Sequence, residues 1–241
     1  GTPIQGSPLG VIDQHDSVAG ELEAVLDLLM TRIAAASRPV VLPTVTLKRF
    51  GLVSAFEAFL NASGLSYATT PMDKALLSED HPAFLGMYNG GRSTPAALRS
   101  VVEDADLLID LGGLVLEDLN TGLWSGSLDP KRIIALHADW VQAGDRVFTS
   151  VSISDALAGL TQRFQHSATR LSSWGDQRFI QPAPLLTLSG AADQRTDSAV
   201  FYPRLQQFLR PTDLLVSDTG TCLLKLNAIR LPAGVSMESQ T

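Results

Sequence analysis

The chain has 241 residues, 45% of them hydrophobic, which is enough for one large globular domain or for a medium domain with extensions. Its net charge of −7 comes without a stripe of Lys and Arg, which argues against a nucleic-acid surface. The apolar runs are shorter than the roughly 20 residues of a membrane span, the first ten residues lack the pattern of a secretion signal, and the single cysteine forms no internal disulfide, so we expect a cytoplasmic protein.

The first third of the chain alternates helices with short apolar strands. Apolar residues recur at helical spacing from Glu21 to Ala36 and predict a helix with one buried stripe. The run RPVVLP at 38–43 predicts a buried parallel strand. A second helix is expected from about Leu52 to Asn61, with Gly64 placed to stop it, and SYATT at 66–70 is the next strand.

The middle of the chain predicts a long connection followed by a helix and a strand. Residues 72–91 mix polar, Gly and Pro residues, and a connection of this length in a compact domain is usually functional or contacts another domain. Thr94 and Pro95 have the residue types of an N-cap and a first helical position, so we expect a helix at 95–105. DLLIDLGG at 106–113 predicts a buried strand that ends in two glycines.

Two further elements complete the pattern, a strand in KRIIALHAD at 131–139 and a helix in SDALAGLTQRF at 154–164. Strands that alternate with helices at this spacing imply right-handed crossovers and a parallel sheet covered on both faces, so the fold class is α/β. Residues from about 165 to 194 have the irregular composition of an interdomain linker.

The last block restarts with a helix, a strand and a turn at 201–220, in which Pro203 argues for a kink or for a late helix start. The turn reads SDTGT at 217–221. A strand end followed by glycine and hydroxyl residues offers backbone N–H groups and short side chains to a polar or anionic ligand. On residue types alone, an ordinary turn in which Thr or Ser caps a helix is the more frequent explanation, and Asp218 fits an Asx turn equally well.

Four segments occur in the order seen in the thiamine-diphosphate-dependent 2-keto acid decarboxylases, the pyruvate and indolepyruvate decarboxylases: HPAFLGMYNG, DADLLIDLGGLVLEDLNTG, KRIIALHAD and TDLLVSDTGTCLLKLNAIRLP. The resemblance covers about Ser37 to Leu231, and DLNTG and SDTGT are its more specific parts. It implies the central Rossmann-like domain of a three-domain enzyme and the start of its diphosphate-binding domain. The domains expected on this basis are an N-terminal linker at 1–20, the central domain at 21–164, an interdomain linker at 165–195 and an incomplete diphosphate-binding domain at 196–241.

The resemblance also implies a chemistry. In such an enzyme the C2 carbanion of thiamine diphosphate adds to a 2-keto acid, CO2 leaves and an aldehyde is released. Thr221 would then contact the cofactor diphosphate, Thr219 would line the active cleft, and Gly220 would allow close approach of the backbone. The family's activating glutamate and its Gly-Asp-Gly motif for Mg²⁺ are missing, so we expect no catalytic residue, no metal ligand, no bound cofactor and no activity in this chain.

The resemblance also implies partners, and the sequence leaves two other interpretations of the chain open. The resemblance implies a parent enzyme that forms a homo-oligomer and supplies the missing pyrimidine-binding and diphosphate-binding domains. The alternative is a free-standing nucleotide-binding or regulatory Rossmann-like module, although no G-x-G-x-x-G follows the first strand and Pro43 stands where a glycine turn is required. A third interpretation is that the chain is a purely structural interaction domain with exposed apolar patches.

Single residues of other types are expected to be structural. His81 and His137 are isolated in sequence, and Asp118, Asn120 and Thr121 lie in a segment typical of turns. Cys222 is expected to be a small packing residue, although a helix N-terminus lowers the pKa of a thiol. We also expect residues 219–241 to be the least tightly held part of the chain, because the strand after Asp213 lacks a sheet to join.

Overall fold

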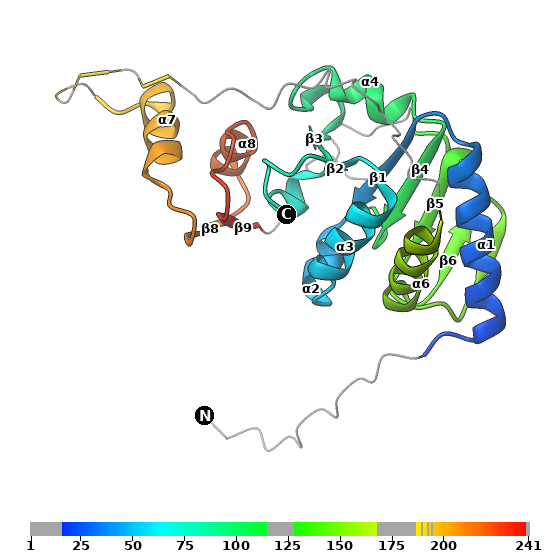
Figure 1. The fold of residues 1–241 in the computed structure, drawn as a ribbon. Coiled ribbons are helices and arrows are strands. Elements are labelled where there is room, and N and C mark those ends of the chain that lie inside the picture. Colours follow the sequence, from blue (N-terminus) through cyan, green and yellow to red (C-terminus); the bar gives the residue numbers. More distant parts are fainter. Residues whose placement is uncertain are drawn as a thin grey trace, which may run out of the picture.

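The computed structural model describes residues 16–114, 128–167, 187–188, 190–191, 193 and 195–239. In this part of the chain a seven-stranded sheet carries helices on both faces, and a smaller unit with a two-stranded sheet lies beside it (Figure 1). In spatial order the strands of the large sheet are β3 (Phe84–Met87), β2 (Tyr67–Thr69), β1 (Pro39–Pro43), β4 (Leu107–Leu111), β5 (Ile133–Leu136), β6 (Val141–Ala143) and β7 (Arg146–Phe148).

The five strands from β3 to β5 are parallel, which confirms the predicted α/β class with a Rossmann-like order. β1 and β4 lie at the centre and pair along their whole length, from Pro39 opposite Leu107 to Pro43 opposite Leu111. Every residue of both strands is buried, as expected for strands covered on both faces.

Three strands of the sheet were not predicted from the sequence. β3 lies inside the segment 72–91 that was predicted to be a connection. β6 and β7 form an antiparallel hairpin at the sheet edge, with Gly144 at φ 59° in the turn between them. The sheet is thus mostly parallel, as predicted, and the antiparallel edge was not foreseen because strands of three residues are too short to show a period.

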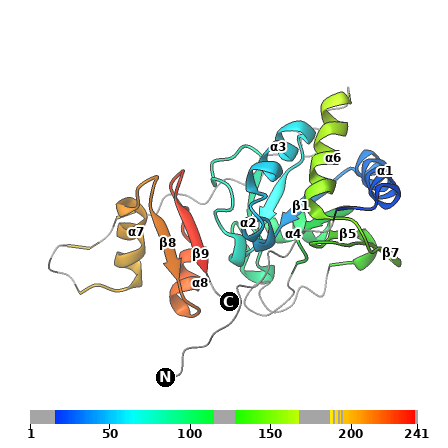
Figure 2. The ribbon, with the colours of Figure 1, turned by 90° about the horizontal axis from the view of Figure 1, so that it is seen from below.

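One face of the sheet is covered by α1 (Ala19–Ala35), α3 (Val53–Ser63) and α6 (Ile153–His166), which lie together in Figures 1 and 2. The helices predicted at 21–36, 52–61 and 154–164 are confirmed to within a few residues at each end. Gly64 ends α3 as expected, with φ 73° and its N–H bonded to the carbonyl of Leu60. The opposite face is covered by α4 (Leu98–Glu103), whose Leu98 and Val102 belong to the same buried apolar cluster as Val40 and Leu42 of β1.

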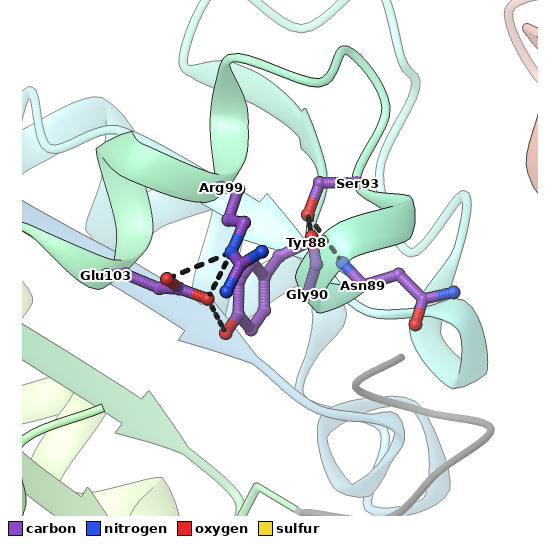
Figure 3. A network of polar contacts seen from close by, with 6 residues as sticks. All are labelled: Tyr88, Asn89, Gly90, Ser93, Arg99 and Glu103. Atoms are coloured by element: carbon purple, nitrogen blue, oxygen red, sulfur yellow. Dashed lines mark hydrogen bonds and ion pairs between the residues drawn. The ribbon is translucent and has the colours of Figure 1, made fainter. Parts of the chain in front are cut away.

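The prediction that Thr94 caps a helix starting at Pro95 is wrong. The helix begins three residues later, and Thr94 instead exchanges two backbone hydrogen bonds of 2.9 Å with Met87 at the end of β3. The reversal between them is closed by Ser93, whose hydroxyl accepts from the N–H of Asn89 at 3.0 Å and donates to the carbonyl of Gly90 at 2.7 Å (Figure 3). Because the backbone of Thr94 is bonded to β3, it is not available to start a helix.

A second polar network fixes α4 on this reversal. Arg99 donates to both carboxylate oxygens of Glu103, at 3.0 and 3.1 Å, and the hydroxyl of Tyr88 donates to the same carboxylate at 3.3 Å (Figure 3). The remaining short helices of this domain are α2 (Val45–Arg49), η1 (Pro71–Asp73), η2 (Gly90–Arg92) and η3 (Pro130–Arg132).

The smaller unit consists of α7 (Ser198–Phe208), β8 (Leu214–Ser217), α8 (Thr221–Asn227) and β9 (Ser236–Ser239). The predicted helix and strand are confirmed, the turn after them leads into α8, and β9 adds a second strand. β8 and β9 are parallel and pair from Leu214 opposite Ser236 to Ser217 opposite Ser239 (Figure 2). The expectation that residues after Asp213 lack a sheet is therefore wrong, as is a late helix start, because Pro203 lies inside α7.

Six apolar side chains from α8, β9 and the segment between them form the core of this unit: Leu223, Leu226, Ile229, Leu231, Val235 and Met237. Tyr202 and Leu205 of α7 pack against this core. None of the helices in the described ranges combines the length and the hydropathy that a membrane crossing requires.

Candidate functional site

The candidate site is the turn at 217–221, which leads from β8 into α8. Ser217 is buried at the end of the strand, whereas the four residues that follow are exposed. Gly220 has φ 145° and ψ −164°, a conformation that favours glycine, and a Cβ added to it would meet no atom within 4 Å. The space above the backbone at this position is therefore open to a ligand.

The turn is shaped by Asp218 and carries two exposed threonines. The carboxylate of Asp218 accepts a hydrogen bond of 2.7 Å from the N–H of Thr219, the residue that directly follows it. Gly220 occupies the N-cap position of α8 and no side chain caps the helix, so the frequent explanation of Thr219 or Thr221 as a helix cap is wrong here. The three predicted residues, Thr219, Gly220 and Thr221, lie side by side on the exposed turn.

Cys222 follows the turn and is exposed, so the prediction of a packing residue is wrong. Its sulfur lies 3.6 Å from the hydroxyl oxygen of Ser217 and 3.5 Å from the carbonyl oxygen of Asp218. The buried positions in the first turns of α8 are taken by Leu223 and Leu226 instead.

The small unit, which carries the turn, is held against the rest of the described chain, called here the large domain because it contains the seven-stranded sheet. The connection between β2 and β3 makes this contact. In this connection Lys74 and Glu79 form a buried ion pair, with side chains 3% and 6% exposed. The second carboxylate oxygen of Glu79 accepts a buried hydrogen bond of 2.8 Å from the N–H of Leu231, between α8 and β9. The methyl group of Ala75 packs on the core of the small unit.

Two exposed ion pairs flank these buried contacts. Arg230 pairs with Asp80, next to Glu79, and Lys48 of α2 pairs with Glu238 of β9 at 2.5 Å. Lys48 also donates to the carbonyl of Met237 at 3.1 Å. β9 is thus the strand of the small unit that contacts the large domain, and β8, with its turn, lies on the far side of β9.

The carboxyl ends of β1 and β4 form a second place where a Rossmann-like fold can hold a ligand. Here they are joined directly, because the hydroxyl of Thr46 donates to the carbonyl of Gly112 at 3.0 Å. A Cβ on Gly112 would lie 2.2 Å from the hydroxyl oxygen of Thr44, and one on Gly113 would lie 2.7 Å from Nδ1 of His137. The two glycines therefore serve close packing of the strand ends.

Both histidines that the sequence marked as structural have structural contacts. The ring of His137 stacks on Trp140 with centroids 3.6 Å apart, and the ring of His81 packs edge-on against Tyr67. Nδ1 of His81 also accepts from the N–H of Ala83 at 3.2 Å. Burial lowers the pKa of both imidazoles, which favours their neutral forms.

Sequence reasoning missed two buried carboxyl groups near the same edge of the sheet. Asp73 follows β2 and accepts from the N–H of Thr70 at 2.9 Å, while burial, together with repulsion from Asp110, raises its pKa to about 8. Asp110 lies in β4 and accepts from the N–H of Leu114 at 2.6 Å, and burial raises its pKa to about 7. In each group the second oxygen has no hydrogen-bond partner. A carboxylate inside the apolar run LLIDL was the available signal for Asp110.

Several predicted turn residues lie outside the described residues, namely Asp118, Asn120 and Thr121. Among the described residues, no three of His, Cys, Asp and Glu come close enough together to hold a metal ion.

Comparison with known proteins gives one family and a consistent group of relatives. The family model described as "Thiamine pyrophosphate enzyme, central domain" matches residues 26–163. The alpha-keto-acid decarboxylase of Mycobacterium leprae is 31% identical over 214 residues, which cover 87% of this chain and 36% of that protein.

Two yeast proteins give the same picture. The pyruvate decarboxylase of Hanseniaspora uvarum is 29% identical over 209 residues, covering 86% of this chain and 36% of that protein. The pyruvate decarboxylase isozyme 2 of Saccharomyces cerevisiae is 28% identical over 231 residues, covering 95% of this chain and 39% of that protein. The chain thus spans little more than a third of the length of these relatives.

Proposed function

Because the chain belongs to the thiamine pyrophosphate enzymes, of which it contains the central domain, we propose that it is part of a 2-keto acid decarboxylase that converts a 2-keto acid into an aldehyde and CO2. The names of its relatives support this activity, since they are alpha-keto-acid and pyruvate decarboxylases. Membership of the family implies dependence on thiamine diphosphate. The keto acid remains open between pyruvate, indolepyruvate and phenylpyruvate.

The observation that carries the proposal is the turn at 217–221, where an open glycine is flanked by two exposed threonines. These residues fit a diphosphate, because its oxygens accept hydrogen bonds from hydroxyl groups and its bulk requires a backbone without a side chain. We assign Thr221 to the diphosphate, Gly220 to close approach of the backbone, and Thr219 to the wall of the cleft. When bound, the cofactor supplies the carbanion and stores the electrons of decarboxylation.

The remaining assignments concern the parent enzyme. We place the central domain at 21–164, between linkers at 1–20 and 165–195, and the start of a diphosphate-binding domain at 196–241. We propose that Mg²⁺ and the activating carboxylate are supplied by polypeptide outside this chain, so that the isolated chain binds no cofactor and has no activity. The parent is further proposed to be a cytoplasmic homo-oligomer.

The test uses the complete protein encoded around this segment. Aldehyde release from pyruvate, indolepyruvate and phenylpyruvate is followed in a coupled dehydrogenase assay, with and without thiamine diphosphate and Mg²⁺. Activity that depends on the cofactor with at least one of these acids is expected, and its absence with all three overturns the proposal. Turnover by the 241-residue chain alone overturns the assignment of the missing parts.

The role of the turn is tested with T221V in the complete protein. Loss of one hydroxyl that bonds a charged group is expected to raise the cofactor concentration for half-maximal activity by about tenfold or more. The matched control is T161V on α6, whose hydroxyl donates to the carbonyl of Leu157 within its own helix. A T221V enzyme with the cofactor requirement of the T161V enzyme contradicts the assignment.

The alternative of a nucleotide-binding module finds less support. The hydrogen bond from the hydroxyl of Thr46 to the carbonyl of Gly112 lies at the strand ends where a dinucleotide would bind. Thermal unfolding of the chain with ADP, NAD or FAD tests this alternative, because a ligand that binds only the folded state raises the melting temperature. A clear rise in the melting temperature with any of the three nucleotides would support this alternative.

A further inference from the structure

The large domain contacts the small unit through a buried polar group rather than through an apolar surface alone. Glu79 lies between two partners, since one carboxylate oxygen pairs with Lys74 and the other accepts the N–H of Leu231 at 2.8 Å. Both side chains of the ion pair are almost completely buried. Exchange of these contacts for water is therefore unfavourable, and the position of Leu231 relative to the β2–β3 connection is well determined.

The position of Leu231 determines the position of β9. Leu231 is 1% exposed and belongs to the same core as Val235 and Met237, which lie at the entry of β9 and within it. The N–H of Val235 is bonded to the carbonyl of Pro232, so the segment between Leu231 and β9 is short and closed on itself. A shift of Leu231 would move β9 with it.

The position of β9 in turn determines the candidate turn. β8 pairs with β9 along four residue pairs, and the last pair joins Ser217 to Ser239. Ser217 is the first residue of the turn. Among the described residues β8 pairs with no other strand. The turn after β8, which carries Thr219, Gly220 and Thr221, therefore depends on β9 for its position.

We propose that Glu79 is a positioning residue for the cofactor turn, acting from the large domain through the N–H of Leu231, β9 and β8. This inference rests on the function proposed above for the turn. Lys74 holds the carboxylate of Glu79 in place by pairing with its other oxygen. Ala75, between them, has φ 59°, a conformation that is unfavourable for a residue with a side chain, and its methyl group contacts the core of the small unit. The strained backbone is consistent with a connection that is shaped by this contact.

The exposed ion pairs at the same interface are not expected to share this role. Arg230 with Asp80, and Lys48 with Glu238, have side chains between 27% and 46% exposed, where water and salt weaken the attraction. A variant of one of these exposed pairs therefore serves as a control, because it disturbs the interface and leaves the buried contact between Glu79 and Leu231 unchanged.

The experiment compares two double variants that both remove the buried charges. K74M/E79Q keeps a carbonyl oxygen that can accept the N–H of Leu231, whereas K74M/E79L has an apolar side chain of similar volume and no acceptor. In the 241-residue chain, amide exchange of Leu231 and of β8 and β9 is expected to be about tenfold faster in K74M/E79L than in K74M/E79Q. Exchange in β1 and β4 is expected to be equal in both, and D80N is expected to behave like the wild type.

In the complete protein, thiamine diphosphate is titrated against intrinsic tryptophan fluorescence. K74M/E79L is expected to need about tenfold more cofactor for half-saturation than K74M/E79Q, with kcat at saturating cofactor equal within about twofold. A merely structural role would lower the melting temperature and leave the cofactor requirement equal in both variants, which would overturn the proposal.

The two proposals fail in different ways. If the wild-type complete protein binds no thiamine diphosphate, the proposed function fails, while the exchange experiment still decides whether Glu79 positions the turn. If K74M/E79L does not fold, the wild-type chain provides the answer, because the proposal requires the Leu231 amide to exchange together with β8 and β9 as denaturant is added. A Leu231 amide that exchanges much faster than both strands contradicts it.

Discussion

The hydroxyl of Thr46 donates a hydrogen bond of 3.0 Å to the carbonyl oxygen of Gly112 and thereby joins the chain after β1 to the end of β4. These are the two central strands of the sheet, and their carboxyl ends meet here without a side chain on Gly112. The contact is close enough that the backbone of Gly112 touches the side chains of both Thr44 and Thr46.

We therefore predict that G112A lowers the free energy of unfolding by about 2 to 4 kcal/mol. The new Cβ would lie 2.2 Å from the hydroxyl oxygen of Thr44, and φ of 116° is unfavourable for alanine. The matched control is G20A, near the start of α1, where a Cβ meets nothing within 4 Å and should raise stability by about 0.5 kcal/mol. Urea unfolding measures both, and equal midpoints for the two variants would contradict the packing at Gly112.

The two buried carboxyl groups predict that stability falls as pH rises. Burial raises the pKa of Asp73 to about 8 and that of Asp110 to about 7, against about 3.9 in an unfolded chain. Between these values the folded state keeps protons that the unfolded chain has released. Each group therefore removes up to about 1.4 kcal/mol of stability per pH unit, from about pH 4 to pH 7 for Asp110 and to pH 8 for Asp73.

Unfolding midpoints measured from pH 5 to pH 9 check this dependence. D73N and D110N carry no titrating proton, so each is expected to flatten the profile in its own window. D104N, which removes an exposed carboxylate at the end of α4, is expected to keep the wild-type slope. A wild-type stability that is constant or rises across this range would show that Asp73 and Asp110 are ionised in the folded protein.

The exposed sulfur of Cys222 predicts a thiol that reacts without denaturant. Ellman's reagent is expected to modify one thiol per native chain at a rate within about tenfold of that in urea, and C222S should give no reaction. In the complete protein, thiamine diphosphate with Mg²⁺ is expected to slow the reaction, because Cys222 directly follows the proposed cofactor residues. A thiol that reacts only after unfolding would contradict the exposed placement.

The small unit is expected to exchange its amides faster than the large sheet. β8 and β9 form a sheet of only two strands, and Leu214 and Val216 of β8 are 59% and 71% exposed, whereas β1 and β4 are buried throughout. Hydrogen exchange of the 241-residue chain should therefore show the fastest exchange among its strands in β8 and β9, within a region that includes residues 219–239. Protection equal to that of β4 would contradict this expectation.

The sequence was sufficient for the fold class because the central strands and the long helices have strong patterns. PVVLP and LLIDL are continuous apolar runs, and the stripe from Val25 to Ile33 has helical spacing. The late start of α4 could not be predicted, because the residue types of Thr94 and Pro95 fit a helix start while the backbone of Thr94 is bonded to Met87. That bond depends on tertiary structure, which local residue preference does not include.

The candidate site was predictable only in part. SDTGT was identified from family resemblance, and residue types alone favoured an ordinary capped turn. The buried contact between Glu79 and Leu231 joins residues 152 positions apart, and no local pattern indicates it. Within SEDHP, Glu79 has the appearance of an exposed turn residue, although it is buried with Lys74.

The contact between Glu79 and Leu231 also bears on how chimeric enzymes of this family should be assembled. An exchange of domains at the chain segment between α6 and α7 would separate the two halves of a buried hydrogen bond, because the acceptor lies in the large domain and the donor in the small unit. A chimera that carries residues 70–83 from the same parent as β8 and β9 keeps Lys74, Ala75 and Glu79 matched to Leu231. The contacts that hold the small unit therefore include residues far along the chain from the segment between α6 and α7.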